Sequence, residues 1–149
     1  MADLPLDEKA QKEQLGRLQD SVLPFAERML KGAGEFYPFG GTMNAQGVIT
    51  QVGGYTGSER PKFAEVIALL KEGFRKQAES RQIVASALVY DVRVIPPGSK
   101  EKTDAVAVSL DHRGGMSIIM LYPYRISADK QVSFGQPFAQ KGSGDVFRK

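Results

Sequence analysis

The sequence predicts an α+β protein, with a mainly antiparallel five-stranded sheet and two helices in the order helix, strand, strand, helix, strand, strand, strand. Three observations support this fold class. Apolar residues recur at spacings of three and four in two separate segments, which is the helical period. The strings Asn44–Gly47 and Gly114-Gly115 are turn signals between extended runs. A long extended run, Ile83–Ile95, stops at Pro96-Pro97-Gly98.

The composition is that of one soluble globular domain, which we expect to span residues 1–149 and to lie in the cytoplasm. Of 149 residues, 42% are hydrophobic and 25% are charged, with a net charge of +3. The sequence has no apolar run of the length a membrane helix needs and no dense basic run, so we expect neither a membrane nor a nucleic-acid partner. The chain has no cysteine, which excludes disulfides, a thiolate nucleophile and Cys-ligated metals.

The first helix is predicted after a frayed lead-in over residues 1–13. Pro24 interrupts the helical pattern, so it either kinks one continuous helix or lies in the first turn of a second helix capped by Ser21. Gly32–Gly34 ends the helix. Its apolar face consists of Leu15, Leu18, Val22, Phe25, Ala26, Met29 and Leu30.

A hairpin and a second helix follow. The runs Glu35–Met43 and Val48–Val52 flank a turn in which Gly47 supplies a positive φ. The loop Gly53–Ser58 leads into a helix over Glu59–Ser80; the loop could bind an anion, or it could simply cap the helix. The apolar face of this helix consists of Phe63, Val66, Ile67, Leu70 and Phe74.

A three-strand meander completes the sheet, over Ile83–Ile95, Asp104–His112 and Met116–Ile126. On the first of these strands, small residues such as Ala85 and Ala87 share one face, which would allow a helix to approach closely. Large apolar residues occupy the other face, so both faces need cover. We expect one or two helices to pack on a face of the sheet and residues 127–149 to form an irregular, extended segment.

The string Glu35-Phe36-Tyr37-Pro38-Phe39 is the first candidate site. Its aromatics, including Tyr37 and Phe39, could line a ligand or peptide groove in which Glu35 is the anchoring carboxylate. Alternatively, the aromatics fill the core beneath the first helix and Pro38 marks an edge strand or a bulge.

The same string carries a resemblance. Together with the hairpin and the strands Ala85–Arg93 and Asp104–Val108, Gly34–Gly40 resembles a family of small bacterial proteins of unknown function, over most of residues 22–138. The resemblance implies a bacterial, cytosolic origin and brings no activity or cofactor. The element order is also similar to the roadblock/longin group of profilin-like domains, which commonly dimerise and serve as platforms for regulatory partners. This chain lacks the final helix of the roadblock pattern.

Polar groups in the meander form the second candidate. Asp91 and Arg93 share one face of their strand, and Asp104 lies near them if the next strand pairs antiparallel. They could form a carboxylate-lined site or merely mark a strand end in solvent. His112, the only histidine, could be a general base beside Asp111, or an ordinary turn residue. One histidine excludes a His-based triad and a multi-histidine metal site, but not an all-carboxylate Mg²⁺ or Ca²⁺ site.

The string Tyr122-Pro123-Tyr124-Arg125 is the third candidate. Two tyrosines lie on one face around a proline that cannot donate to a sheet, which places the string at an edge or a bulge. Tyrosine and arginine are common anchors of protein interfaces. Tyr122, Tyr124 and Arg125 are therefore candidate partner-binding residues, unless they simply pack under the C-terminal segment.

The sequence favours a non-enzymatic interaction or regulatory module that forms a homodimer, because no catalytic constellation is found and both faces of two strands need cover. We expect no catalytic residue, no metal and no cofactor. One alternative is a small-molecule binder or an enzyme that uses the Glu35–Phe39 segment with Asp91, Arg93 or His112. Another is an immunity-type protein that neutralises a toxin.

Overall fold

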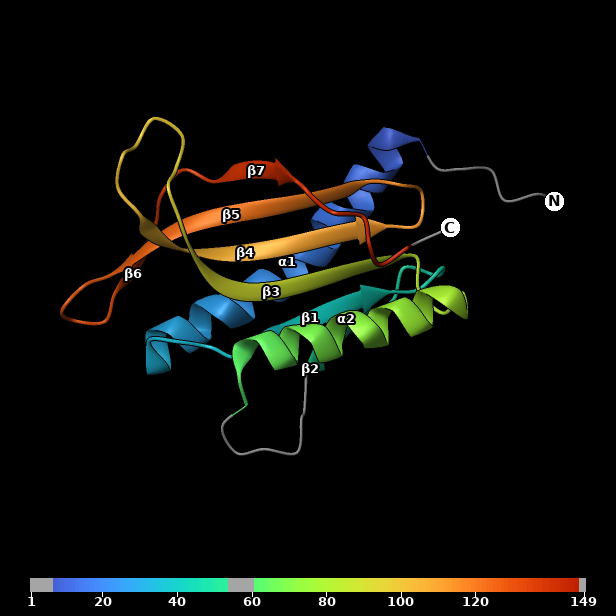
Figure 1. Ribbon diagram of the computed structural model, residues 1–149, viewed down its shortest axis with the longest axis horizontal. Coiled ribbons are helices and arrows are strands. Elements are labelled where there is room, and N and C mark those ends of the chain that lie inside the picture. The colour runs from blue at the N-terminus through green and yellow to red at the C-terminus, as the bar shows by residue number, and fades with distance from the viewer. Residues whose placement is uncertain (1–6, 54–60, 148–149) are drawn as a thin grey trace.

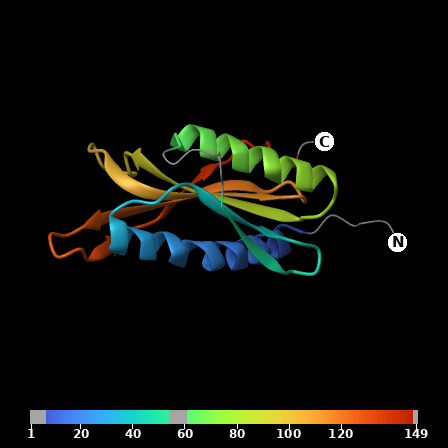
Figure 2. The ribbon, with the colours of Figure 1, turned by 90° about the horizontal axis from the view of Figure 1, so that it is seen from below.

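The computed structural model describes residues 7–53 and 61–147. The fold is α+β, as predicted, with an open antiparallel sheet and two helices, α1 (Glu8–Ala33) and α2 (Phe63–Glu79). The two helices cover opposite faces of the sheet, which lies between them (Figure 2). The expectation that the helices share a face was wrong. Because both faces of the central strands are apolar, a helix on each face buries more of the sheet than two helices on one face.

The sheet has seven strands in the described part of the chain, rather than five. Their order is β2-β1-β3-β4-β5-β6, and β7 also pairs with β5 (Figure 1). Every pairing is antiparallel. The strands are β1 (Phe39–Met43), β2 (Ile49–Gly53), β3 (Ala85–Val94), β4 (Thr103–His112), β5 (Ser117–Ile126), β6 (Val132–Phe134) and β7 (Phe138–Lys141).

The C-terminal segment is therefore not irregular, since β6 and β7 both add to β5. They pair with different parts of β5, and the break between them, residues 135–137, falls opposite Pro123. The carbonyl of Pro123 accepts a hydrogen bond from the Gly135 N–H at 2.8 Å. Because proline has no N–H to return, the outer pairing is interrupted at this point. Pro123 thus lies in a strand paired on both sides, opposite a gap in its outer neighbour.

Helix α1 is continuous through Pro24, which settles the alternative left open by the sequence. It begins at Glu8, inside the predicted lead-in, because Asp7 caps it by accepting a hydrogen bond from the Ala10 N–H at 2.8 Å. It ends at Gly34, whose φ of 74° is the left-handed conformation that glycine adopts most easily. Helix α2 begins at Phe63, with Lys62 as its N-cap residue. The predicted start at Glu59 and residues 54–58 of the predicted loop lie outside the described residues.

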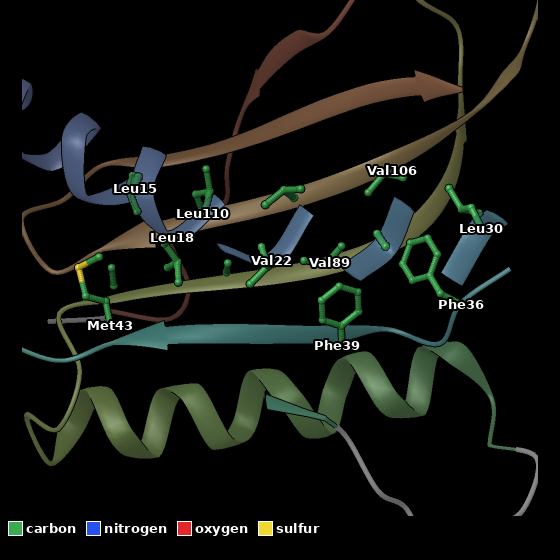
Figure 3. Close-up of a cluster of buried hydrophobic side chains, with 14 of the residues drawn as sticks. Leu15, Leu18, Val22, Leu30, Phe36, Phe39, Met43, Val89, Val106 and Leu110 are labelled. Atoms are coloured by element: carbon green, nitrogen blue, oxygen red, sulfur yellow. The ribbon is translucent and has the colours of Figure 1, made fainter. Parts of the chain in front are cut away.

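The larger hydrophobic cluster lies between α1 and the sheet. Ala85, Ala87 and Val89 of β3 face this helix, which confirms that the small face of the strand receives a closely packed helix. Met29 was predicted on the buried face of α1 but is 36% exposed. Figure 3 shows the cluster, which includes Leu15, Leu18, Val22, Leu30, Phe36, Phe39, Met43, Val106 and Leu110.

A smaller cluster lies on the opposite face, under α2. It joins Val66, Leu70 and Phe74 of the helix to Leu88 of β3. Phe63, predicted on this buried face, is 39% exposed instead and packs against Tyr37, with the ring centroids 5.2 Å apart. Phe63 is the first residue of α2, and the side chains of the helix become buried against the sheet from Val66 onward.

Candidate partner-binding groove

The aromatic segment at residues 35–39 mostly builds the core. Phe39 is buried and makes edge-to-face contacts with Phe25 and Phe36, at centroid distances of 4.9 and 5.9 Å. Tyr37 is 49% exposed instead. It lies two residues before Phe39, so regular strand alternation would place both side chains on one face, but β1 begins only at Phe39 and the alternation does not extend back to Tyr37. Glu35 is also exposed. The segment therefore does not gather its aromatics into one groove.

Asp91 and Tyr124 are brought together by the sheet. The Tyr124 hydroxyl donates to Asp91 Oδ1 at 2.9 Å, across the intervening strand β4. Burial raises the pKa of Asp91, and the carboxylates of Asp104 and Glu35 raise it further, although the Tyr124 hydrogen bond opposes both. Burial and the contact with Asp91 raise the pKa of Tyr124 as well. The tyrosine is therefore a hydrogen-bond donor that ties β5 to β3.

Arg93 pairs with Asp104 in the register of β3 and β4, as the sequence predicted for an antiparallel pair. The two charged groups are 3.7 Å apart and both are more than half exposed. Exposed ion pairs of this kind contribute at most about 1 kcal/mol. With Asp91 and Tyr124, they form a polar end of the sheet.

His112 lies at the opposite end of β4 from Asp104. Its ring is buried, and both nitrogens are engaged: Nδ1 accepts from the Gly114 N–H at 2.8 Å, and Nε2 lies 2.6 Å from Gln14 Oε1. A nitrogen that accepts a backbone hydrogen bond leaves Nε2 as the protonated one. Burial lowers the pKa of His112, and the nearby Arg113 lowers it further. His112 is thus a neutral structural residue, separated from Asp91 and Arg93.

Gln11 makes further hydrogen bonds between α1 and the β4–β5 hairpin. Its Oε1 accepts from the Met116 N–H at 2.9 Å, and its Nε2 donates to the Gly114 carbonyl at 3.3 Å. Neither glutamine was predicted as a site residue. The available signal was their position on the helix, since Gln11 lies four residues before Leu15 and Gln14 four residues before Leu18, which places them on its apolar face.

Tyr124 and Arg125 line a groove of about 560 Å³ at the other end of β5. One wall is the β3–β4 connection, and the other is the break between β6 and β7. Residues from three segments far apart in the sequence line the groove, and most of them are proline, aromatic or charged. They include Pro96, Pro97, Glu101, Lys102, Pro123, Phe134, Pro137 and Phe138.

The lining of the groove is about equally polar and apolar, and it carries three charged side chains. Phe134 is 36% exposed, and Tyr122 supports it from the side in an edge-to-face contact at 6.5 Å. Arg125 and Lys102 supply two positive charges against the one negative charge of Glu101. The structure thus places Tyr122, Tyr124 and Arg125 at or beside one groove. Packing against the C-terminal segment was one of the predicted alternatives. The contact with Phe134 itself and the position of Pro96 were not predicted, because they depend on pairing between distant segments.

Two further observations concern metal ions and membranes. Over residues 7–53 and 61–147, no group of three or more His, Cys, Asp or Glu side chains is arranged to hold a metal ion. No helix in the same ranges is both long and apolar enough to cross a membrane.

Comparison with known proteins gives no assignment, since no protein-family model, curated protein or solved structure matches this chain. The resemblances to a small bacterial family and to roadblock/longin domains therefore stay predictions. Function has to be argued from the groove and the residues around it.

Proposed function

We propose that this protein is a non-enzymatic interaction module that binds an extended segment of a partner protein in the groove between the β3–β4 connection and the β6–β7 break. The observation that carries the proposal is the groove itself, with its aromatic and proline lining. Its volume is within the roughly 300–1,000 Å³ of binding sites for small ligands, and a few side chains of a peptide would fill it.

The edge of the sheet beside the groove can pair with an extended chain. Gly142 donates to the Ser117 carbonyl of β5, and alternate residues of a strand point the same way. The backbone groups of Gln140 and Phe138 therefore also face β5, while those of Ala139 face outward. An extended segment laid along β7 would hydrogen-bond to these outward groups and bring its side chains to the groove.

The side chains of the groove define the chemistry of the partner segment. Phe134 and Phe138 provide apolar rings for aromatic, proline or branched aliphatic residues. Among the charged side chains of the groove, Arg125 and Lys102 carry two positive charges and Glu101 carries one negative charge. An acidic residue in the segment would therefore gain a favourable charge interaction. The partner segment is therefore extended and apolar, and it contains at least one carboxylate.

Site-specific photo-crosslinking in native lysate tests this proposal. A benzophenone amino acid replaces Phe134 in the groove, and in a matched control it replaces Leu69 on the outer side of α2. The two side chains are 36% and 40% exposed, so both probes are equally accessible. Mass spectrometry then identifies the cross-linked peptides. Arg125→Ala in the probe-bearing chain tests whether the positive charge of Arg125 contributes to binding.

We expect one partner to be cross-linked at position 134 and not at position 69, through a peptide that contains Asp or Glu, and we expect Arg125→Ala to reduce its yield. Equal labelling at the two positions would contradict the proposal. Cross-links at position 134 only to a second copy of this chain would also contradict the proposal of a separate partner protein. They would instead favour the homodimer that the sequence predicts.

A further inference from the structure

A second hollow lies on the face of the sheet that carries α2. It has a volume of about 480 Å³ and shares no lining residue with the groove. Its lining comes from α2, from β3, β4 and β5, and from β7 with the residues after it. The residues are Ile67, Lys71, Leu88, Tyr90, Ser109, Ile119, Lys141, Gly142 and Ser143.

Gly142 and Ser143 line one side of this hollow. They begin a C-terminal segment, residues 142–147, which we call the strap and which is held in place by several interactions. Gly142 donates to the Ser117 carbonyl at 3.1 Å, and Gly144 donates to Ser117 Oγ at 3.0 Å. Asp145 then forms ion pairs with Lys71 at 3.3 Å and Arg75 at 2.9 Å. Because the strap is held to both β5 and α2, the hollow is preformed, and a ligand would not have to order it.

The walls combine apolar side chains with a few polar groups. Ile67 of α2, Leu88 of β3 and Ile119 of β5 supply hydrocarbon surface from three elements. The hydroxyls of Ser109 and Tyr90 and the ammonium of Lys71 supply hydrogen-bond donors. This combination is typical of sites for small molecules, in which a few polar groups orient a mostly apolar ligand.

The charged side chains at or beside the hollow carry a net charge of +1. Lys71, Arg75 and Lys141 lie at or beside the hollow, against the carboxylates of Asp145 and the buried Asp111. Asp145 already accepts from both Lys71 and Arg75, so each cation is only partly neutralised. A ligand with a single negative charge would balance the set, whereas a cation would add to the excess.

We propose that this hollow binds a small amphipathic carboxylate, with the carboxylate at Lys71 and the hydrocarbon chain between Ile67, Leu88 and Ile119. A lysine is a compact point charge that suits one carboxylate oxygen, and Ser109 or Tyr90 can donate to the other oxygen. The site is separate from the partner-binding groove, so its test does not depend on the proposed function.

Binding of octanoate to the full chain, followed by amide chemical shifts, tests the site. Octylamine has the same chain length and the opposite charge, so it separates the charge requirement from general hydrophobic binding. Lys71→Met removes the ammonium while Arg75 still holds Asp145, and Lys76→Met is its matched control in an exposed pair with Glu72 on the same helix. Ser109→Leu fills the hollow and leaves Lys71 untouched.

We expect octanoate, and not octylamine, to shift the amides of Leu88, Ser109 and Ile119. Lys71→Met should weaken octanoate binding by about tenfold or more, as expected for the loss of one charge-assisted hydrogen bond, and Lys76→Met should leave it nearly unchanged. Ser109→Leu should abolish binding in a chain that still folds. Equal shifts with octylamine, unchanged binding in Lys71→Met, or shifts confined to residues outside the hollow would overturn the proposal.

Discussion

At the scale of single residues, the buried polar side chains fasten one element to another. His112 is 3% exposed and links the β4–β5 hairpin to α1 through Gln14, while Gln11 makes two more bonds to the same hairpin. Buried polar groups are costly unless they are hydrogen-bonded, and here each nitrogen of the ring has a partner. The role of His112 is therefore to set where the N-terminal half of α1 meets the sheet.

The first prediction is that His112 makes the protein less stable in acid. Because the folded pKa is lowered, the unfolded chain binds the proton first as pH falls, so stability is full above the unfolded pKa of about 6.5 and is lost below it. His112→Gln should cost about 1–3 kcal/mol at neutral pH through lost hydrogen bonds. It should also flatten the fall in stability below pH about 6.5. Urea unfolding of both chains across this range measures the difference, and parallel pH profiles would contradict the prediction.

The second prediction concerns the bond between Tyr124 and Asp91. Tyr124→Phe removes the donor and leaves a partly buried carboxyl with one partner fewer, which should cost about 1–2 kcal/mol at neutral pH. It should also raise the pKa of Asp91 further, because the Tyr124 hydrogen bond is what lowers it. Urea unfolding and an NMR titration of the Asp91 carboxyl measure the two effects. Tyr122→Phe, on the same face of β5, is the matched control, and an equal cost for the two variants would refute the role of this bond.

At the scale of elements, β1 packs closely against a helix on each of its faces. A Cβ on Gly40 would collide with the Ala87 carbonyl and the Phe74 ring of α2. A Cβ on Gly41, on the other face, would lie 2.8 Å from Val22 of α1. Two adjacent glycines therefore allow the sheet to be covered on both sides at this point.

The third prediction follows from that packing. Gly40→Ala and Gly41→Ala should each destabilise the protein by about 1–3 kcal/mol or more. At Gly40 the added methyl group meets a backbone carbonyl and an aromatic ring that cannot easily move, and at Gly41 it meets the buried side chains of Val22 and Leu18. Gly73→Ala in α2 is the matched control. It meets nothing within 4 Å, and it should stabilise the protein by up to about 1 kcal/mol through helix propensity. Thermal unfolding of the three variants measures the costs, and a neutral Gly40→Ala would show that α2 is less closely packed.

The sequence was most informative where local chemistry decides structure. The helical period located α1 and α2, the turn residues located both hairpins, and the alternation along β3 indicated cover on both faces. It failed for β6 and β7, which have only three and four residues, too few to show a periodic pattern, so their pairing with β5 decides their structure. It also failed to assign the helices to faces, because an apolar face does not specify which helix covers it.

The candidate sites divide in the same way. The motif around Pro123 led to Tyr124 and Arg125 because proline and tyrosine carry local information about edges and interfaces. Phe134 and the two prolines at 96 and 97 complete the groove only through pairing between segments far apart in the sequence. The Glu35–Phe39 segment does not place its aromatics together, because Phe39 is buried while Tyr37, which precedes β1, is exposed.

At the scale of the whole molecule, one strand joins the two hydrophobic clusters. Ala87 and Val89 of β3 belong to the cluster under α1, while Leu88 between them belongs to the cluster under α2. Loss of either helix would expose one face of β3 and remove packing that holds the strand in place. The two faces should therefore unfold together.

The fourth prediction is a single cooperative transition that responds equally to both clusters. Leu18→Ala under α1 and Leu70→Ala under α2 are a matched pair, at 0% and 3% exposure, and each should cost about 2–5 kcal/mol. Urea unfolding followed by circular dichroism should shift as one step in each variant. Hydrogen exchange should show the slowest amides of α1 and α2 losing protection by the same free energy. If Leu70→Ala instead releases α2 while the slowest amides of α1 keep their protection, then the sheet and α1 are stable without α2, and the coupling through β3 is absent.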